Sequence, residues 1–432
     1  MGAPTSITFD GTPTVPLGPL FSARVRSDPF AYYRSLHELG APVLAIEQPA
    51  RYRFILCGFE AASQALRDPA FQVLDGTMMA LPPSWEERRT HAVFCHSMMF
   101  TNPPRQTLMR RLFAHTFTPR RIMDLEPQID EICADLLDAM ARRAAAGEPV
   151  DFMRDFAFPM PAAVLGRLLG VPDSDLPWYR PRAAELAKVI ELGGSTEENM
   201  RRADRASEEL TDYFAEVVAQ RRARPADDLI TALVQAQAAE EDQLTDRELL
   251  SNLVVVFNAG FVTTVHLLGN GLTLLLEQPE LWERALTDRS VLPGYVDEIL
   301  RCQGPTHFVV RKAVTDVEVC GTPIPAGSEV LVLLAAANRD PSRYADPDRF
   351  DPHRPQRPHL AFSSGAHYCL GAALAKMEGE RGLSALLDRF PGIGLAVEPP
   401  VPHQLMLRGH EELWVRLSAG FPAAQPAGSL AQ

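Results

Sequence analysis

The residue with the clearest chemical potential is Cys369, which stands in a glycine-rich loop directly before a predicted helix, 372–387. A cysteine at a helix start lies near the positive end of the helix dipole and near backbone N–H groups that lack partners. Both effects favour the thiolate, the form in which cysteine binds a metal. Gly365 and Gly371 permit tight turns and a close approach of a bound group to the backbone. His367, two residues before the sulfur, is placed to donate to an acidic group on that ligand.

The loop 361–371 reads Ala-Phe-Ser-Ser-Gly-Ala-His-Tyr-Cys-Leu-Gly. For an isolated cysteine, a buried structural role is the usual interpretation. Here the string matches Phe-x-x-Gly-x-His-x-Cys-x-Gly, and the chain therefore resembles the cytochrome P-450 family. The resemblance implies that Cys369 is the axial thiolate ligand of haem b, iron protoporphyrin IX. It also implies that this cofactor contacts Phe362, His367 and Gly371.

The longest helical pattern begins after Thr245, a predicted N-cap, and extends for ~30 residues toward Gln278. This span is apolar nearly all round, which indicates a helix buried at the centre of the protein. It is also long enough to cross a membrane. Several asparagine, threonine and histidine residues interrupt 249–276, so a buried helix is the favoured interpretation.

The middle of that helix reads Ala-Gly-Phe-Val-Thr-Thr, from Ala259 to Thr264. Small residues at Ala259 and Gly260 allow close approach of a planar cofactor or dioxygen, or merely ease helix packing. The family pattern here is Ala/Gly-Gly-x-Asp/Glu-Thr, which implies that Thr263 acts in oxygen activation and proton relay. Val262 stands where the family has an acid, and a valine cannot relay a proton. Either water and polar groups of the substrate replace the acid, or the chemistry differs from simple hydroxylation.

Two further segments match cofactor contacts of the family. Gln106 and Arg110 are four residues apart and share one face of a predicted helix, which by itself indicates an ordinary solvated basic face. The resemblance places Arg110 and Arg311 on the haem propionates, with Gln106 as an uncharged donor where relatives often have histidine. Together with His367, these residues would neutralise two buried carboxylates.

A structural network is expected behind the cysteine loop. Glu298 and Arg301 carry opposite charges three residues apart on a predicted helix, a pattern common in surface pairs. The resemblance adds Arg349 and implies a buried Arg–Glu–Arg network that holds the chain leading into the loop. We therefore expect structural roles for Glu298, Arg301 and Arg349.

Composition limits the remaining possibilities. The chain has 432 residues and a formal net charge of -13, which argues against nucleic acid as a partner. No linker, repeat or charge block divides it, so we expect one domain over 1–419 and a disordered tail, rich in Ala, Pro, Gly and Ser, over 420–432. Six cysteines without a C-x-x-C pair fit a reducing cytoplasm. The N-terminus has no apolar h-region, so we expect no signal peptide and no membrane anchor.

Helical periodicity and strand alternation predict the rest of the architecture. The first expected helix follows an N-cap and an early proline at 27–29 and runs to about 39–40. The others are 59–67, 126–146, 196–222 and 227–239, with a hairpin at 42–57 and strands within 309–327 and near 413–417. The resemblance implies a mainly α, single-domain cytochrome P-450 fold, a triangular prism of helices with small β-sheets. The haem would be buried between the long central helix and the cysteine-loop helix. The resemblance also places 71–100, 176–194 and 402–406 around the substrate pocket.

The implied function is that of a soluble bacterial haem-thiolate monooxygenase acting on a lipophilic small molecule. It would insert one atom of O2 by hydroxylation or epoxidation, in the tailoring of an antibiotic or other natural product. Ferredoxin and ferredoxin reductase would supply electrons to a monomer, and Arg110, Arg111, Lys376 and Arg381 would attract the ferredoxin. The alternatives are an oxygen-independent or peroxide-using isomerase or dehydratase, suggested by Val262, and a non-catalytic haem sensor.

Overall fold

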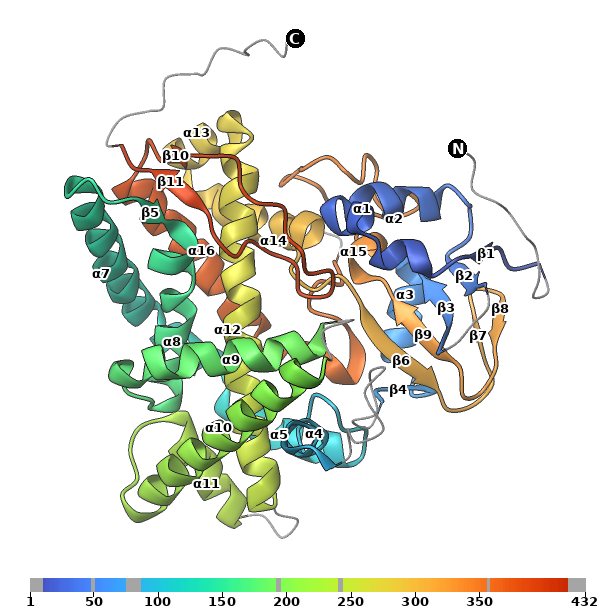
Figure 1. Cartoon of the computed structure of the whole chain (residues 1–432), viewed down its shortest axis with the longest axis horizontal. Coiled ribbons are helices and arrows are strands. Elements are labelled where there is room, and N and C mark those ends of the chain that lie inside the picture. Colours follow the sequence, from blue (N-terminus) through green and yellow to red (C-terminus); the bar gives the residue numbers. More distant parts are fainter. Residues whose placement is uncertain are drawn as a thin grey trace.

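The computed structural model describes residues 11–47, 51–74, 87–191, 196–239, 244–355 and 358–418. Helices dominate this part of the chain, and the strands form three small sheets, so the predicted mainly α class is confirmed (Figure 1). The predicted tail 420–432 and the centre of segment 71–100 lie outside the described residues.

The helices match the predicted segments closely. They are α1 Ala23–Ser27, α2 Pro29–His37, α3 Phe59–Arg67, α4 Arg89–Cys95, α5 Arg105–Thr116, α6 Pro119–Asp124, α7 Glu126–Ala145, α8 Pro159–Leu169, α9 Leu176–Ile190, α10 Glu197–Ala223, α11 Leu229–Ala239, α12 Asp246–Leu276, α13 Pro279–Thr287, α14 Leu292–Gln303, α15 Leu334–Ala337 and α16 Ala372–Arg389. The N-cap and early proline predicted at 27–29 are confirmed, because the Asp28 carboxylate accepts the N–H of Ala31 at 3.1 Å and caps α2, whose first residue is Pro29. Asp28 itself is not helical, since a proline disfavours helical geometry in the residue before it.

The strands build one main sheet and two minor ones. They are β1 Thr14–Val15, β2 Val43–Ile46, β3 Tyr52–Leu56, β4 Phe71–Gln72, β5 Val150–Asp151, β6 Val309–Ala313, β7 Val317–Val319, β8 Thr322–Ile324, β9 Glu329–Val332, β10 Gly394–Leu395 and β11 Trp414–Arg416. The main sheet has the order β1-β2-β3-β9-β6-β4, and β2 and β3 form the predicted hairpin. Arg311 pairs with Val330 of β9 in this sheet, which fixes where its buried side chain can reach.

The central helix is α12, drawn in yellow in Figure 1, which packs against α4, α8, α9, α10, α14 and α16. Its predicted cap is confirmed as a capping box. The Thr245 hydroxyl accepts the N–H of Glu248 at 3.2 Å, and the Glu248 carboxylate accepts the N–H of Thr245 at 2.8 Å. Arg105 of α5 donates its Nε to the same carboxylate at 2.7 Å. The start of α12 is therefore tied to the helix that carries Gln106 and Arg110.

The burial of α12 shows its role. It is long and apolar enough to cross a membrane, but 72% of the relevant window is buried inside the protein, as predicted for a core helix. Within 251–275, the positions that keep partial exposure are Val256, Ala259, Gly260, Val262 and Thr263. All five line one internal cavity. Other side chains thus bury this part of α12 fully, except at the positions that line the cavity.

Candidate active site

The cysteine loop owes its shape to Gly365. This residue has φ +69°, and a Cβ there would overlap the carbonyl oxygen of Leu66 and lie 2.9 Å from the Cα of Arg67. Only glycine fits both the backbone angle and the contact with α3. Gly371 has an ordinary φ of -88°, and a Cβ there would meet nothing within 4 Å. The tight turn predicted at Gly365 is confirmed, whereas Gly371 leaves open space at the start of α16.

Two hydrogen bonds hold the loop in place. The N–H of Cys369 donates to the carbonyl of Phe362 at 2.9 Å and closes the loop on itself. The side-chain amide of Gln106, which is 1% exposed, donates to the carbonyl of Ala366 at 2.8 Å. The sequence predicted a cofactor contact for Gln106, but in the structure its amide N–H supports the loop.

The ionisation of Cys369 differs from the expectation. Burial raises the pKa of its thiol, although the Gly371 N–H and the charge of Arg110 act in the opposite direction. The predicted net lowering is wrong for the chain by itself, because the helix start does not offset the loss of solvation. A bound metal ion deprotonates a coordinating thiol outright, so metal binding would supply the missing stabilisation.

Cationic groups converge beside this loop without a matching anion. Arg311 is 5% exposed, and its guanidinium donates to the neutral carbonyl of Val310 at 2.8 Å. Burial lowers its pKa to about 10, so it stays charged at neutral pH. Burial, Arg311 and Arg110 lower the pKa of His367 to about 3. Among the described residues, no ion pair joins a carboxylate to Arg110 or Arg311. A ligand with two carboxylates, such as haem, fits this arrangement.

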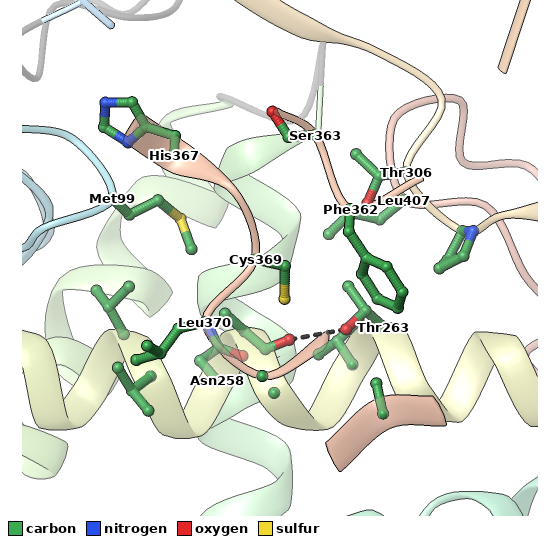
Figure 2. A pocket seen from close by; sticks show the side chains of 18 of the residues that line it. Met99, Asn258, Thr263, Thr306, Phe362, Ser363, His367, Cys369, Leu370 and Leu407 are labelled. Atoms are coloured by element: carbon green, nitrogen blue, oxygen red, sulfur yellow. Dashed lines mark hydrogen bonds between the residues drawn. The ribbon is translucent and has the colours of Figure 1, made fainter. Parts of the chain in front are cut away.

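The cavity between the loop and α12 has a volume of about 360 Å³ and a largely apolar lining. Figure 2 shows Cys369 and Phe362 facing it across from Asn258 and Thr263 of α12. Parts of the predicted pocket segments also line it, namely Val73, Met98, Phe100, Ile190 and Met406, together with the next residue, Leu407. Every catalytic and cofactor-contacting residue predicted from the sequence, except Gln106, therefore lines a single apolar space.

The polar groups of α12 in this cavity are few. Thr263 donates its hydroxyl to the carbonyl of Ala259 at 2.9 Å, and Thr264 donates to Gly260 at 3.2 Å. A Cβ at Gly260 would lie 3.0 Å from Leu165, so this glycine also serves helix packing, the alternative that the sequence left open. The carbonyl oxygen of the buried Asn258 side chain has no hydrogen-bond partner.

One lining residue, Glu378 of α16, was missed by the sequence analysis. It is 1% exposed, and burial raises the pKa of its carboxyl well above the usual value. The sequence did contain a signal: Glu378 stands four residues after the buried Leu374 and four before the buried Gly382, on the inward face of a predicted helix.

The expected network behind the loop exists with a different third member. Arg301 donates to both carboxylate oxygens of Glu298 at 2.7 and 2.8 Å, and both side chains are buried. Arg354 lies on the same carboxylate at 3.5 Å. Arg349 is exposed and contributes its carbonyl oxygen, which accepts from Arg301 and Arg354. The side-chain role predicted for Arg349 is therefore wrong, because the chain turns outward at that residue and inward again at Arg354.

Fold and site together define a haem-thiolate enzyme. The chain matches the family described as Cytochrome P450 over residues 10–172 and 184–404. It is 34% identical to the cytochrome P450 monooxygenase PikC of Streptomyces venezuelae, over 98% of each chain. It is 35% identical to the 6-deoxyerythronolide B hydroxylase of Saccharopolyspora erythraea, over 89% of this chain and 96% of the relative.

Solved structures give the same result. P450BioI, in complex with an acyl carrier protein ligated to hexadec-9Z-enoic acid, has a TM-score of 0.84 and 30% identity, covering 92% of this chain and all of that one. The tirandamycin C-bound monooxygenase TamI has a TM-score of 0.78 and 33% identity, covering 92% and 99%. The chain belongs to the cytochrome P450 family. It is a monooxygenase whose cofactor is haem b, and the isomerase, dehydratase and sensor alternatives are not favoured.

Proposed function

We propose that this monooxygenase oxidises a lipophilic natural product in a site built on Cys369, with haem held between α12 and α16. The observation that carries the proposal is the convergence of a buried thiol with two arginines that lack carboxylate partners among the described residues, at the wall of an apolar cavity. Haem bound there supplies the binding and reductive activation of O2 and the transfer of one oxygen atom to carbon.

The side chains divide this work. The Cys369 sulfur would hold the haem iron, and Arg110, Arg311 and His367 would bind the propionates through charge-assisted and neutral hydrogen bonds. Phe362 and Gly371 of the cysteine loop, and Ala259 and Gly260 of α12, line the cavity and would contact the macrocycle. Their small or flat surfaces allow close packing against a planar group.

Thr263 and Val262, the α12 residues at the family's threonine and acid positions, differ in whether they can carry a proton. The Thr263 hydroxyl, which donates to Ala259, can turn to hold a proton at its Oγ1 for an acceptor in the cavity. Val262 contributes only an apolar surface there and carries no proton. The proton must therefore reach Thr263 from another group.

The substrate class follows from the cavity lining. Apolar side chains from α9, from the described parts of 71–100 and from the 402–407 turn exclude water and favour a lipophilic ligand. Two of the relatives named above are a hydroxylase of 6-deoxyerythronolide B and a monooxygenase bound to tirandamycin C, which supports hydroxylation or epoxidation in antibiotic or related natural-product tailoring. The side-chain carbonyl oxygen of Asn258 lacks a partner and can accept a hydrogen bond from a hydroxyl group of such a molecule.

Electrons are proposed to come from a ferredoxin and its reductase, in the cytoplasm, to a monomer. The structure changes the predicted docking surface, because two of its four cations are already paired. Lys376 lies 2.6 Å from Asp297, and Arg381 binds Asp130 at 2.5 Å. Arg110 lines the cavity. The positive charge expected at this face is therefore smaller than the sequence suggested.

The proposal is tested by the spectrum of the reduced, CO-bound protein and by turnover. Wild type should show the red-shifted CO band of thiolate-ligated haem, and Cys369→Ser should lose it. Polyketides, terpenes and fatty acids should then be screened for displacement of iron-bound water in the Soret spectrum. Compounds that bind should be oxidised with ferredoxin, reductase and NAD(P)H. Retention of the CO band in Cys369→Ser would show that the ligand is wrongly assigned.

A further inference from the structure

Glu191, the residue that follows α9, binds three consecutive backbone N–H groups from a distant part of the chain. Its Oε1 accepts from Leu405 at 2.7 Å and from Met406 at 3.1 Å, and its Oε2 accepts from Met406 at 3.0 Å and from Leu407 at 3.3 Å. Hydrogen bonds to a carboxylate are roughly twice as strong as those between neutral groups. One side chain therefore holds the segment 405–407 against the end of α9.

The same segment is also bonded to the chain that leads into β6. The N–H of His307 donates to the carbonyl of Met406 at 2.9 Å, and the N–H of Arg408 donates to the carbonyl of Pro305 at 2.7 Å. These two bonds use none of the three N–H groups that bind Glu191. Removal of the carboxylate would therefore leave those three groups without this acceptor, which is unfavourable where they are buried.

The residues joined in this way form part of the cavity wall, whereas Glu191 does not. Ile190, Met406 and Leu407 all line the cavity. Figure 2 shows Leu407 beside Thr306, with which it forms an isolated β-bridge. Glu191 itself does not line the cavity, and both of its carboxylate oxygens accept from backbone N–H groups. This carboxylate therefore positions an apolar wall and does not bind a ligand directly.

We propose that Glu191 is a positioning residue for substrate specificity, which fixes Met406 and Leu407 so that a lipophilic substrate is held in one orientation. The inference rests on the proposed function, because it concerns the substrate of the same site. Without the carboxylate, the segment 405–407 would have to become ordered when a ligand binds, and this ordering would lower the affinity for ligands that contact it. A ligand too small to reach the segment would keep its affinity.

The first test is independent of turnover and uses amide hydrogen exchange of the haem-loaded protein, followed by mass spectrometry. Peptides that cover 404–408 should exchange about tenfold faster or more in Glu191→Ala than in wild type, because three amide hydrogens lose their acceptor. Glu191→Gln keeps one carbonyl oxygen and should give an intermediate rate. Peptides from β6 should exchange equally in all three proteins, which shows that the fold is intact. Unchanged exchange of 404–408 in Glu191→Ala would overturn the inference.

Glu411 offers the matched control. It lies in the same part of the chain and is exposed, and its carboxylate accepts from the side chain of Gln404. Glu411→Gln removes a similar charge near the segment but leaves its backbone hydrogen bonds in place. This variant should match wild type in both tests.

The second test compares two ligands that bind haem iron through a ring nitrogen, imidazole and miconazole, each titrated by its shift of the Soret band. Imidazole is small, whereas miconazole is large and apolar and must pack against the cavity wall. In Glu191→Ala the ratio of the miconazole Kd to the imidazole Kd should rise by about fivefold or more, because the wall is no longer preorganised. A smaller rise, no change or a fall in this ratio would overturn the role in specificity.

The outcomes separate this inference from the proposed function. If wild type lacks the thiolate CO band and binds neither ligand at iron, the proposed function fails, and the role in specificity fails with it. If wild type has that band but the ratio does not rise in Glu191→Ala, the role of Glu191 is wrong and the function stands. If both Kd values rise equally, the effect comes from the haem site as a whole, and the inference is overturned.

Discussion

Arg354→Met and Arg349→Met should have very different effects on stability. The Arg354 side chain, 11% exposed, donates to the carbonyls of Ala345, Asp346 and Arg349 and lies on the Glu298 carboxylate. Methionine keeps the hydrocarbon stem but leaves these acceptors without their shared cation. A net value of about 1 kcal/mol for each of three lost hydrogen bonds predicts a loss of about 3 kcal/mol in the free energy of unfolding.

Arg349 is the matched control for this prediction. Its side chain is exposed, and the hydrogen bonds to its backbone carbonyl survive substitution. Arg349→Met should change the free energy of unfolding by no more than about 0.5 kcal/mol. Urea titrations of the haem-loaded proteins, followed by circular dichroism and Soret absorbance, measure both values. Equal losses in the two variants would refute the assignment of Arg354 to the network.

Three further perturbations have defined outcomes. Gly365→Ala should lower the melting temperature and the haem content, because alanine at φ +69° overlaps the Leu66 carbonyl, whereas Gly394→Ala, with open space around its Cβ, should not. Burial lowers the pKa of His266 to about 4. As the pH falls below 6.5, this histidine is therefore protonated in the unfolded chain before it is protonated in the folded protein. The contribution of neutral His266 to the free energy of unfolding is therefore complete above pH 6.5 and should decrease toward pH 4, by up to about 1.4 kcal/mol per pH unit. His266→Leu should weaken this pH dependence, as measured by urea titrations. Val262→Glu adds a carboxyl at the family's acid position and should change the product formed per NAD(P)H by about twofold; an unchanged ratio would show that the relay does not use this position.

Local chemistry made much of this site predictable. The capping box at Thr245 and the apolar periodicity of α12 each depend on residues within a few positions of one another. Such interactions are encoded in short segments, so their structure can be read from residue type and spacing. The family resemblance then related these segments to a haem site.

The remaining features depend on contacts between distant segments. Gln106 reaches Ala366 across 260 residues, and Glu378 and Thr264 line one cavity because α16 packs against α12. The pKa of Cys369 also depended on burial that its neighbours in sequence do not reveal.

The sequence by itself determined the class of protein, the thiolate ligand expected at Cys369 and the helix expected across from it. Only the tertiary structure decided that Arg354 replaces Arg349 in the network and that Glu378 faces the cavity. The physical reason is that hydrogen bonding, desolvation and side-chain direction are set by whatever the completed fold places around each residue.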